Sequence, residues 1–388
     1  MLGPAQYAVV ASAVAALYIL NLPALVVQTV SARFTSVAAG KGRLGNVPGL
    51  ILQVSGLGLV VGVAIAATLL LFGGPISAYL QISDRRVVGF LALASVIALL
   101  VAATRGALQG LRRFVALSIN VLVDMSVRVA SVAGLVLAGF GALGGVVALV
   151  IGPAVSYGQS LFLFRGLRAA QAGDRASIRQ VGRYAVMASI GAIGTTYLYN
   201  ADVILSKHYL TAEAAGIYAA ASVLGRVVYF LGITVAQVMF PEVATLHAKN
   251  EPHYHVVELS LGLMASVVVV LTVIYAVVPG LVVLPFGPAF NPVRPYLWPF
   301  ALSLGLLSII NIFINYFLSI NSSRFVIPLT GAAVLETALI VNFHSSAGRI
   351  LGMVVSTMAV LALALGGMYG FERLRSGGAS GHRRLESS

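Results

Sequence analysis

Long, unbroken apolar runs constrain this chain more than any other feature of its sequence. About eleven of them reach the roughly 20 residues that a helix needs to cross a bilayer. A backbone in lipid must satisfy its own hydrogen bonds, so such runs cross as helices. Two runs fill Tyr184–Leu246 and flank a polar break at Lys207–Glu213. We therefore predict an all-α integral membrane protein, with this helix pair opening its second half.

Composition excludes a soluble globular protein. Apolar residues make up 59% of the 388 residues and charged residues only 9%, whereas soluble domains carry about 25% charged residues. Outer-membrane barrels alternate polar and apolar residues in segments of about 10, and these runs are longer and continuous. The 41 glycines suit close packing of membrane helices.

The net charge of +13 reflects basic residues in short loops between the apolar runs. Because Lys and Arg stay on the cytoplasmic side of a membrane, we interpret these charges as topology rather than as a nucleic-acid surface. Placing the loop after the first span in the cytoplasm puts most basic loops, and the C-terminus, on that side. It also places Met1 outside.

The runs divide into two lobes joined by a basic segment. We expect an N-terminal lobe of about five transmembrane helices and a C-terminal lobe of about six, which gives a two-lobed transporter bundle. The expected parts are the N-terminal lobe at 1–164, a basic cytoplasmic linker at 165–183, the C-terminal lobe at 184–371 and a disordered basic cytoplasmic tail at 372–388.

Two span boundaries matter for the site. The first span is expected at about 8–30, kinked at Asn21 and Pro23. The third is expected to end at about Thr104, which leaves Arg105, Arg112 and Arg113 in a cytoplasmic loop. We interpret these three arginines as topology determinants rather than as a gate for substrate.

Charged residues inside spans mark candidate sites, because they are expensive at membrane depth. Asp124 and Arg128 are four residues apart and share one helix face; they either neutralise each other or line a cavity. Arg226 has no acid at helical spacing, so its partner is Asp202 or the substrate. We expect a substrate cavity lined by Arg226, Arg128, Asp124 and Asn200.

Two further acids are candidates for coupling transport to protons or sodium ions, namely Asp202 and Glu336. Alternatively, Asp202 lies near the outer interface beside Lys207, and Glu336 makes a hydrogen bond to a neighbouring helix. Aromatic residues of an interfacial belt are expected at Tyr229, Tyr296 and Trp298.

A weak internal repeat relates the two lobes. The segment LGPAQYAVVASAV, which begins at Leu2, resembles LTAEAAGIYAAAS, which begins at Leu210. A helix directly precedes the second copy but not the first. We therefore expect that the chain lacks one N-terminal helix.

Several segments together resemble a known family. They are LGPAQY from Leu2, LQGLRRF at Leu108–Phe114, the run Asn200–Val227, and LPFGPAF at Leu284–Phe290. In order and spacing the chain resembles polysaccharide-biosynthesis membrane proteins, the O-antigen-type flippases of the multidrug/oligosaccharidyl-lipid/polysaccharide exporter superfamily.

The resemblance implies two lobes of six helices around a central cavity, so that the first helix is missing here. It also implies translocation of undecaprenyl-pyrophosphate-linked saccharides across the bacterial cytoplasmic (inner) membrane by alternating access. Expected partners are membrane lipids, the lipid-linked saccharide, and polysaccharide polymerases or glycosyltransferases.

Enzyme signatures are not found. The chain has no nucleophile elbow, no phosphate-binding Gly-Lys loop and no cysteine, so we expect no catalysis and no cofactor. His247, His253 and His255 favour a solvated loop over a metal site. The alternatives are a multidrug/cation antiporter, a membrane enzyme, which the short loops disfavour, and a truncated non-transporting subunit. The saccharide, the coupling ion and the oligomeric state have no signature in the sequence.

Overall fold

The computed structural model describes residues 13, 17, 20–79, 84, 86–164, 177–284 and 288–385. The chain forms two compact units, Met1–Ser189 and Ile190–Ser388, and each is considered by itself. The boundary between them falls inside one long helix, α8 (Ile178–Tyr209). All regular elements of the described residues are helices, as the apolar runs predict.

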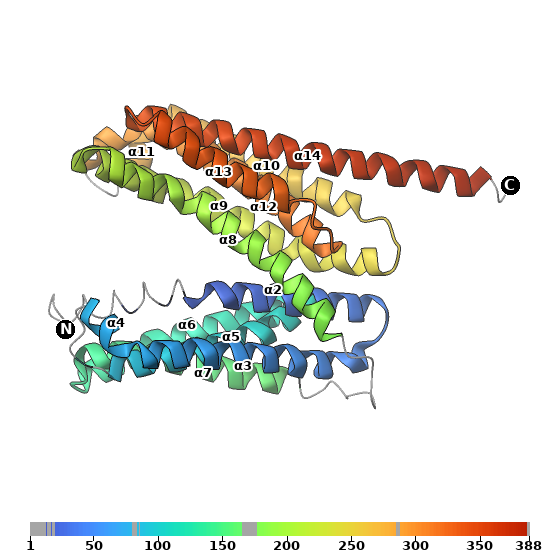
Figure 1. Ribbon diagram of the computed structural model, residues 1–388, viewed down its shortest axis with the longest axis horizontal. Coiled ribbons are helices and arrows are strands. Elements are labelled where there is room, and N and C mark those ends of the chain that lie inside the picture. Colours follow the sequence, from blue (N-terminus) through green and yellow to red (C-terminus); the bar gives the residue numbers. More distant parts are fainter. Residues whose placement is uncertain are drawn as a thin grey trace. The chain divides into compact units, whose positions relative to one another are not determined.

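The first unit is a bundle of long helices that run side by side (Figure 1). Its centre is α5, which packs against α2, α3 and α7, while α6 packs mainly against α7. A short helix, α4, follows α3. The bounds are α2 Leu22–Gly40, α3 Val47–Leu71, α4 Gly73–Tyr79, α5 Arg86–Gly110, α6 Phe114–Leu137 and α7 Gly141–Leu163.

Two glycines let α2 and α5 approach closely. A Cβ on Gly106 would collide with the backbone oxygen of Gln28, and one on Gly110 would lie 2.5 Å from the backbone oxygen of Ala32. Small residues four apart form such backbone-to-backbone seams between membrane helices. The seam keeps α5 helical beyond Thr104, so our expected end of the third span is wrong. Arg105 belongs to the helix and not to a loop.

The first expected span ends too early, because α2 starts at Leu22 and continues to Gly40 instead of ending near Val30. The break at Asn21 lies where we expected a kink, and the expected start of the span lies outside the described residues. Pro23 lies in its first turn, where the missing amide hydrogen has no helical partner to lose. Ala13, Leu17 and Leu20 are helical too, and Asn21 forms the turn before α2. The segment LGPAQY and most of the first repeat copy lie outside the described residues.

The second unit is organised around α12, which packs against α9, α10 and α14. Gly232 of α9 faces Ser308 of α12 so closely that a Cβ would collide with it. Thr211 separates α8 from α9 and caps α9, since its side chain accepts a hydrogen bond from the Ala214 amide at 3.4 Å. The bounds are α9 Ala212–Ala248, α10 Tyr254–Val277, α11 Pro279–Val283, α12 Arg294–Ser319, α13 Val326–Asn342 and α14 Ala347–Leu385.

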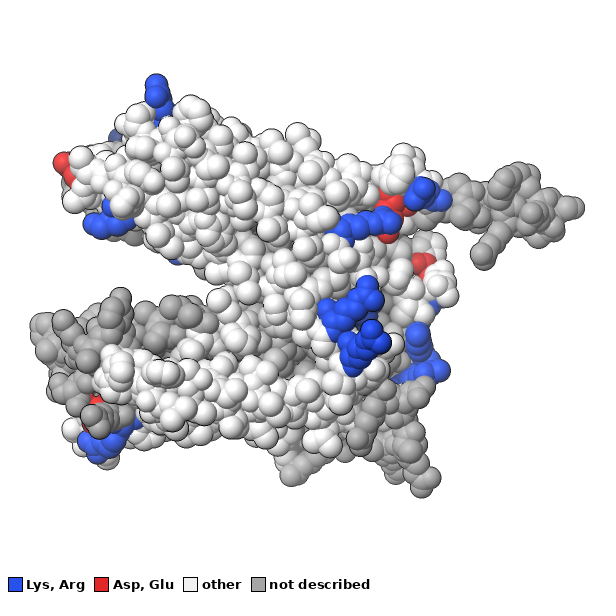
Figure 2. Space-filling model, in the orientation of Figure 1, with Lys and Arg blue, Asp and Glu red and all other residues white. Residues whose placement is uncertain are grey.

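The helices are those of a multi-pass membrane protein. Within the described residues, 9 helices are long and apolar enough to cross a bilayer, and α13 is a shorter apolar helix. Together with α8, which is 32 residues long, they correspond to the eleven expected spans. On the face shown in Figure 2, charged side chains gather near helix ends and the lengths between them carry none.

The last helix, α14, extends into the segment that we expected as a tail at 372–388. It ends at Leu385, and 386–388 lie outside the described residues. Ion pairs hold the start of this extension against the bundle: Glu372 pairs with Arg324 at 3.5 Å, and Arg373 pairs with Glu258 at 3.0 Å. Of the expected linker, 165–176 lies outside the described residues, and α8 has already begun at Ile178.

Candidate functional site

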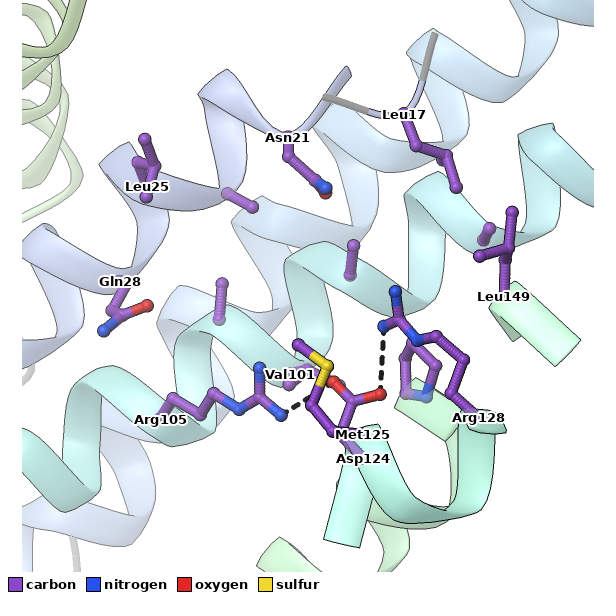
Figure 3. Close-up of a pocket in the computed structure, with 15 residues that line it drawn as sticks. Leu17, Asn21, Leu25, Gln28, Val101, Arg105, Asp124, Met125, Arg128 and Leu149 are labelled. Carbon is purple, nitrogen blue, oxygen red and sulfur yellow. Dashed lines mark hydrogen bonds and ion pairs between the residues drawn. The ribbon is translucent and has the colours of Figure 1, made fainter. Parts of the chain in front are cut away.

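A buried carboxylate shared by two arginines is the centre of the first unit's charged site. Asp124 of α6 is only 2% exposed. Its Oδ2 accepts a hydrogen bond from Nη2 of Arg105 on α5 at 2.9 Å, and its Oδ1 accepts one from Nη2 of Arg128 at 2.9 Å. Figure 3 shows the two guanidinium groups on either side of the carboxylate. Two cations therefore share one acid, and the group carries one net positive charge.

A polar network fixes Arg105 independently of the acid. Its Nε donates to Oδ1 of Asn120 at 2.8 Å, and its Nη2 also reaches the hydroxyl of Ser156 on α7 at 3.3 Å. Asn120 is fully buried, and its amide nitrogen donates to the backbone oxygen of Ser156 at 2.7 Å and to the side chain of Gln159 at 2.9 Å. The guanidinium orientation is thus set by α6 and α7 together.

Helix α7 lies very close to the acid of α6. A Cβ on Gly152 would lie 2.7 Å from Oδ1 of Asp124 and 3.0 Å from Cβ of Arg128. Gly152 is followed by Pro153, which lies inside α7. Only a residue without a side chain allows α7 to lie against the ion pair, and this contact keeps water from the carboxylate.

The charged group faces a cavity of about 320 Å³ within the first unit. The acid is the most buried of the three charged side chains. The Asp124 side chain is 3% exposed, whereas those of Arg105 and Arg128 are 18% and 29% exposed. The cavity wall comes from α2, α5, α6 and α7. Its polar lining residues are Asn21, Gln28, Arg105, Asp124 and Arg128.

This arrangement suits an anionic ligand. Guanidinium groups bind phosphate and carboxylate through two parallel hydrogen bonds, and the net charge of the group is positive. The Nε of Arg128 is buried and lacks a hydrogen-bond acceptor among the described residues. A buried donor without an acceptor is costly; because this Nε is itself buried, an anion in the cavity would satisfy it only if the Arg128 side chain turned toward the ligand.

The second unit holds a different cation. Arg226 of α9 donates from Nη2 to Oδ1 of Asn200 at 3.2 Å and lies 4.4 Å from the ring centre of Tyr199, a cation–π geometry. The Tyr199 ring in turn packs against Tyr229, at 4.8 Å between ring centres. Tyr229 is 7% exposed and accepts a hydrogen bond from Asn311 at 3.2 Å. It is therefore a buried residue and not part of an interfacial belt.

Two carboxyl groups are buried in the same unit. Asp202 of α8 is 5% exposed and accepts a hydrogen bond from the hydroxyl of Tyr218 on α9 at 2.9 Å. Glu336 of α13 is 0% exposed, and neither of its carboxyl oxygens has a hydrogen-bond partner among the described residues. The two acids interact electrostatically with each other.

These positions meet our expectations only in part. Asp124 and Arg128 pair along one helix face, as their spacing predicts. Arg226 and Asp202 do not take each other as hydrogen-bond partners: Arg226 bonds to Asn200, and Asp202 to Tyr218. Asp202 is buried within its unit. Glu336 lacks the hydrogen bond to a neighbouring helix that we considered for it.

Sequence reasoning missed two members of the first unit's site. Arg105 was assigned to a loop, although Gly106 and Gly110 four residues apart signal a helix seam at that point. Asn120 was not considered, although Asn120, Asp124 and Arg128 follow each other at four-residue steps and so form a polar stripe on one helix face.

The histidines do not form a metal site in the part of the chain that the structure describes, which holds no group of three or more potential metal ligands from His, Cys, Asp and Glu. The rings of His247 and His253 meet edge to face at 5.3 Å, and His253 stacks on Tyr254 at 4.7 Å.

Comparison with known proteins places the chain in a family. The sequence model of the family described as polysaccharide biosynthesis protein matches residues 50–294, which is more than half of the chain. The chain belongs to this family. No curated protein matches the sequence of this polysaccharide biosynthesis protein.

Solved transporter structures share its fold. An outward-facing multidrug resistance MATE family transporter of the MOP superfamily superposes with a TM-score of 0.81 at 13% identity, over 97% of this chain and 89% of the other. A MOP superfamily transporter from Pyrococcus furiosus, described as having a binding pocket of reverse polarity, gives 0.78 at 12% identity, over 96% and 89%. The eukaryotic MATE transporter AtDTX14 gives 0.79 at 12%, over 95% and 88%. This polysaccharide biosynthesis protein therefore has the fold of MATE transporters.

Proposed function

We propose that the protein is a flippase that carries undecaprenyl-pyrophosphate-linked saccharide units across the bacterial cytoplasmic membrane by alternating access, with its C-terminus in the cytoplasm. One observation carries the proposal. Arg105 and Arg128 share the single acid Asp124 beside a cavity, in a unit built from membrane-spanning helices.

The physical reasoning starts from the cargo. A lipid-linked saccharide keeps its lipid chain in the bilayer, but its pyrophosphate must cross a medium that strongly disfavours charge. Cations in a cavity replace the water that the phosphates lose, and arginine does this with a fixed fork of donors. A group with one spare positive charge attracts an anion more than it attracts a cationic drug. The family membership of the chain agrees with a polysaccharide precursor as cargo.

The buried acids of the second unit fit the same proposal as coupling groups. Asp202 and Glu336 interact with each other in a buried setting, and carboxyl groups at membrane depth serve in proton relays and cation sites. We propose that proton or sodium-ion binding at this pair drives the conformational cycle.

The same two acids favour a second candidate function, a multidrug/cation antiporter. In that case the cargo is an organic cation that binds near Asp202 and Glu336, and the arginines of the first unit have no role in binding cargo. The two functions therefore differ in which unit's charges the transport depends on.

Complementation separates them. A strain that lacks its O-antigen-type flippase would receive the wild-type chain, Arg105→Ala, Arg128→Ala or the control Arg86→Ala, with membrane levels measured for each. Arg86 lies on the same helix as Arg105, but its side chain is 72% exposed. We expect surface polysaccharide to return with the wild type and Arg86→Ala, and to be lost in the two cavity variants.

Drug efflux, measured in the same strains, tests the antiporter directly. Resistance to cationic drugs that depends on Glu336 but not on Arg105, without rescue of surface polysaccharide, would contradict the flippase and support the antiporter. Neither rescue nor efflux at normal membrane levels would indicate a subunit that does not transport.

A further inference from the structure

We propose that Asp124 is an internal counter-ion that competes with the substrate's phosphate groups for Arg105 and Arg128, so that substrate binding displaces the carboxylate from the two guanidinium groups. This inference rests on the proposed function, because it assumes that the cavity of the first unit receives an anion. It adds that Asp124 binds the two arginines when no substrate does, and that Asp124 thereby lowers the affinity of the site for anions.

The two oxygens of the carboxylate bind the two arginines in the way that two oxygens of a phosphate group would. One of its oxygens bonds to Arg105 and the other to Arg128, each at 2.9 Å. An arginine fork accepts carboxylate and phosphate in the same geometry. The Asp124 carboxylate is therefore an anion with two acceptor oxygens, like the phosphate groups of the proposed ligand.

The relative exposure of the three side chains gives the ligand a way in. All three side chains line the cavity, but the arginines are 18% and 29% exposed and the acid only 3%. The cavity, at about 320 Å³, is far larger than the roughly 10–15 Å³ that a single water requires. An anion can therefore meet the guanidinium groups on the side away from Asp124 before the carboxylate has left.

The remaining hydrogen bonds determine what happens when the carboxylate leaves. Arg105 keeps its bonds to Asn120 and Ser156, so it stays in place for the incoming ligand. The Nε of Arg128, which has no acceptor among the described residues, gains one if the side chain turns toward the ligand as the carboxylate leaves. Both cations are thus better satisfied by a ligand with several oxygens than by one carboxylate.

Displacement leaves Asp124 buried without a direct hydrogen bond to either guanidinium group. Its charged neighbours are Arg105 from α5 and Arg128 from its own helix, and α7 offers only Gly152 and the uncharged Ser156. A carboxylate in a low-dielectric site without a cation is better neutral, so it takes one proton from the cavity water for each anion bound. Anion binding at this site is therefore linked to proton uptake.

The test uses the purified full chain in detergent and inorganic pyrophosphate as the probe, titrated calorimetrically at constant ionic strength. Asp124→Asn removes the competing charge and retains the shape. Asp84→Asn is the matched control, because Asp84 pairs with the exposed Arg86 near the start of α5. We expect Asp124→Asn to bind pyrophosphate about tenfold more tightly than wild type, Asp84→Asn to match wild type, and Arg105→Ala to bind at least about tenfold more weakly.

A second measurement needs no variant. Sulfate keeps its charge between pH 5 and 8, so proton uptake on sulfate binding to the wild type reports the protein alone. It is read from titrations in two buffers of different ionisation enthalpy, and we expect uptake approaching one proton. This result decides the matter if Asp124→Asn fails to give a monodisperse, cooperatively melting protein.

The outcomes separate this inference from the proposed function. Wild type and folded Asp124→Asn that bind pyrophosphate equally, or binding without proton uptake, would overturn the counter-ion role while the anion site stands. If neither protein binds pyrophosphate or sulfate, the anion site fails and the counter-ion role fails with it.

Discussion

Gly152 on α7 lies against the carboxylate of Asp124 on α6, so closely that a Cβ at position 152 would be 2.7 Å from Oδ1 and 2.8 Å from the backbone oxygen of Asp124. A tight contact between the two helices therefore coincides with a buried charge of the first unit. Any change at position 152 acts directly on the ion pairs that Asp124 makes.

Adding a methyl group at this contact should be costly. We expect Gly152→Ala to lower the free energy of unfolding by about 1–3 kcal/mol, because the added atom forces α7 away from Asp124, and to reduce transport. The control is Gly158→Ala on the same helix, whose Cβ would meet nothing within 4 Å. Thermal unfolding of the two variants in detergent measures the difference, and equal melting temperatures would contradict the close contact.

Arg105 should not be replaceable by lysine. Lysine keeps the positive charge but lacks the fork that bonds Asn120, Asp124 and Ser156 at once. We expect Arg105→Lys to lose most of the polysaccharide rescue at normal membrane levels. If Arg105 acted only as a topology determinant, lysine would replace it without loss, so a fully active Arg105→Lys would exclude the role that the site gives it.

The seam between α2 and α5 should depend on glycine. We expect Gly106→Ala to destabilise the protein by about 1–3 kcal/mol, because the methyl group would meet the backbone of Gln28. Gly89→Ala lies on the same helix with nothing within 4 Å of its Cβ, and should be neutral or slightly stabilising because alanine favours helix. The measurement is again the melting temperature of each purified variant.

Glu336 should contribute to function at the expense of stability. A buried carboxyl group without a hydrogen bond is unfavourable, and an apolar residue of similar size is often better tolerated. We therefore expect Glu336→Leu to melt at the same or a higher temperature than wild type, and both Glu336→Leu and Glu336→Gln to lose acceleration of transport by an imposed proton or sodium gradient. A marked loss of stability in Glu336→Leu would indicate instead that the carboxyl group holds the bundle together.

A pH dependence of stability should come from His253, in the loop between α9 and α10. Burial lowers the pKa of His253 below its ordinary value of 6.5, and His255 adds to the lowering. The unfolded chain then binds the proton more readily, so the stability from neutral His253 is complete above about pH 6.5 and is lost as the pH falls below it. We expect His253→Phe, which retains the ring stack, to reduce the drop in melting temperature between pH 8 and pH 5.5.

The matched variant for this experiment is His208→Phe, which replaces the same residue type in the last turn of α8. It should retain the wild-type difference in melting temperature between the two pH values. A His253→Phe protein whose difference also equals that of wild type would show that another group carries the pH dependence.

Much of the fold was predictable because it depends on lengths of apolar sequence. The helices that start at Val47, Phe114 and Ala212 each begin an apolar run that follows a short polar loop in the sequence. The start of α2 was predictable in principle, since Pro23 favours the first turn of a helix, but the apolar run before it outweighed this signal.

The site was only partly predictable, because helical spacing gives contacts within one helix and not between helices. Asp124 and Arg128 needed only their four-residue separation. Predicting the ion pair between Arg105 and Asp124 required the register of α5 against α6, and that register is determined by packing between helices. The hydrogen-bond partners of Arg226 and Asp202 likewise depend on how α8 and α9 pack: the two charges interact electrostatically, as expected, but each bonds directly to an uncharged residue.

The contact at position 152 also links two places in the chain that sequence distance separates. A side chain at 152 would meet the backbone oxygen of Asp124 and Cβ of Arg128 as well as the carboxylate. A shorter residue at 124 would therefore remove only part of the clash. We expect relatives that replace the aspartate to keep the glycine, so that position 152 records how closely the two helices pack even where the charge has been lost.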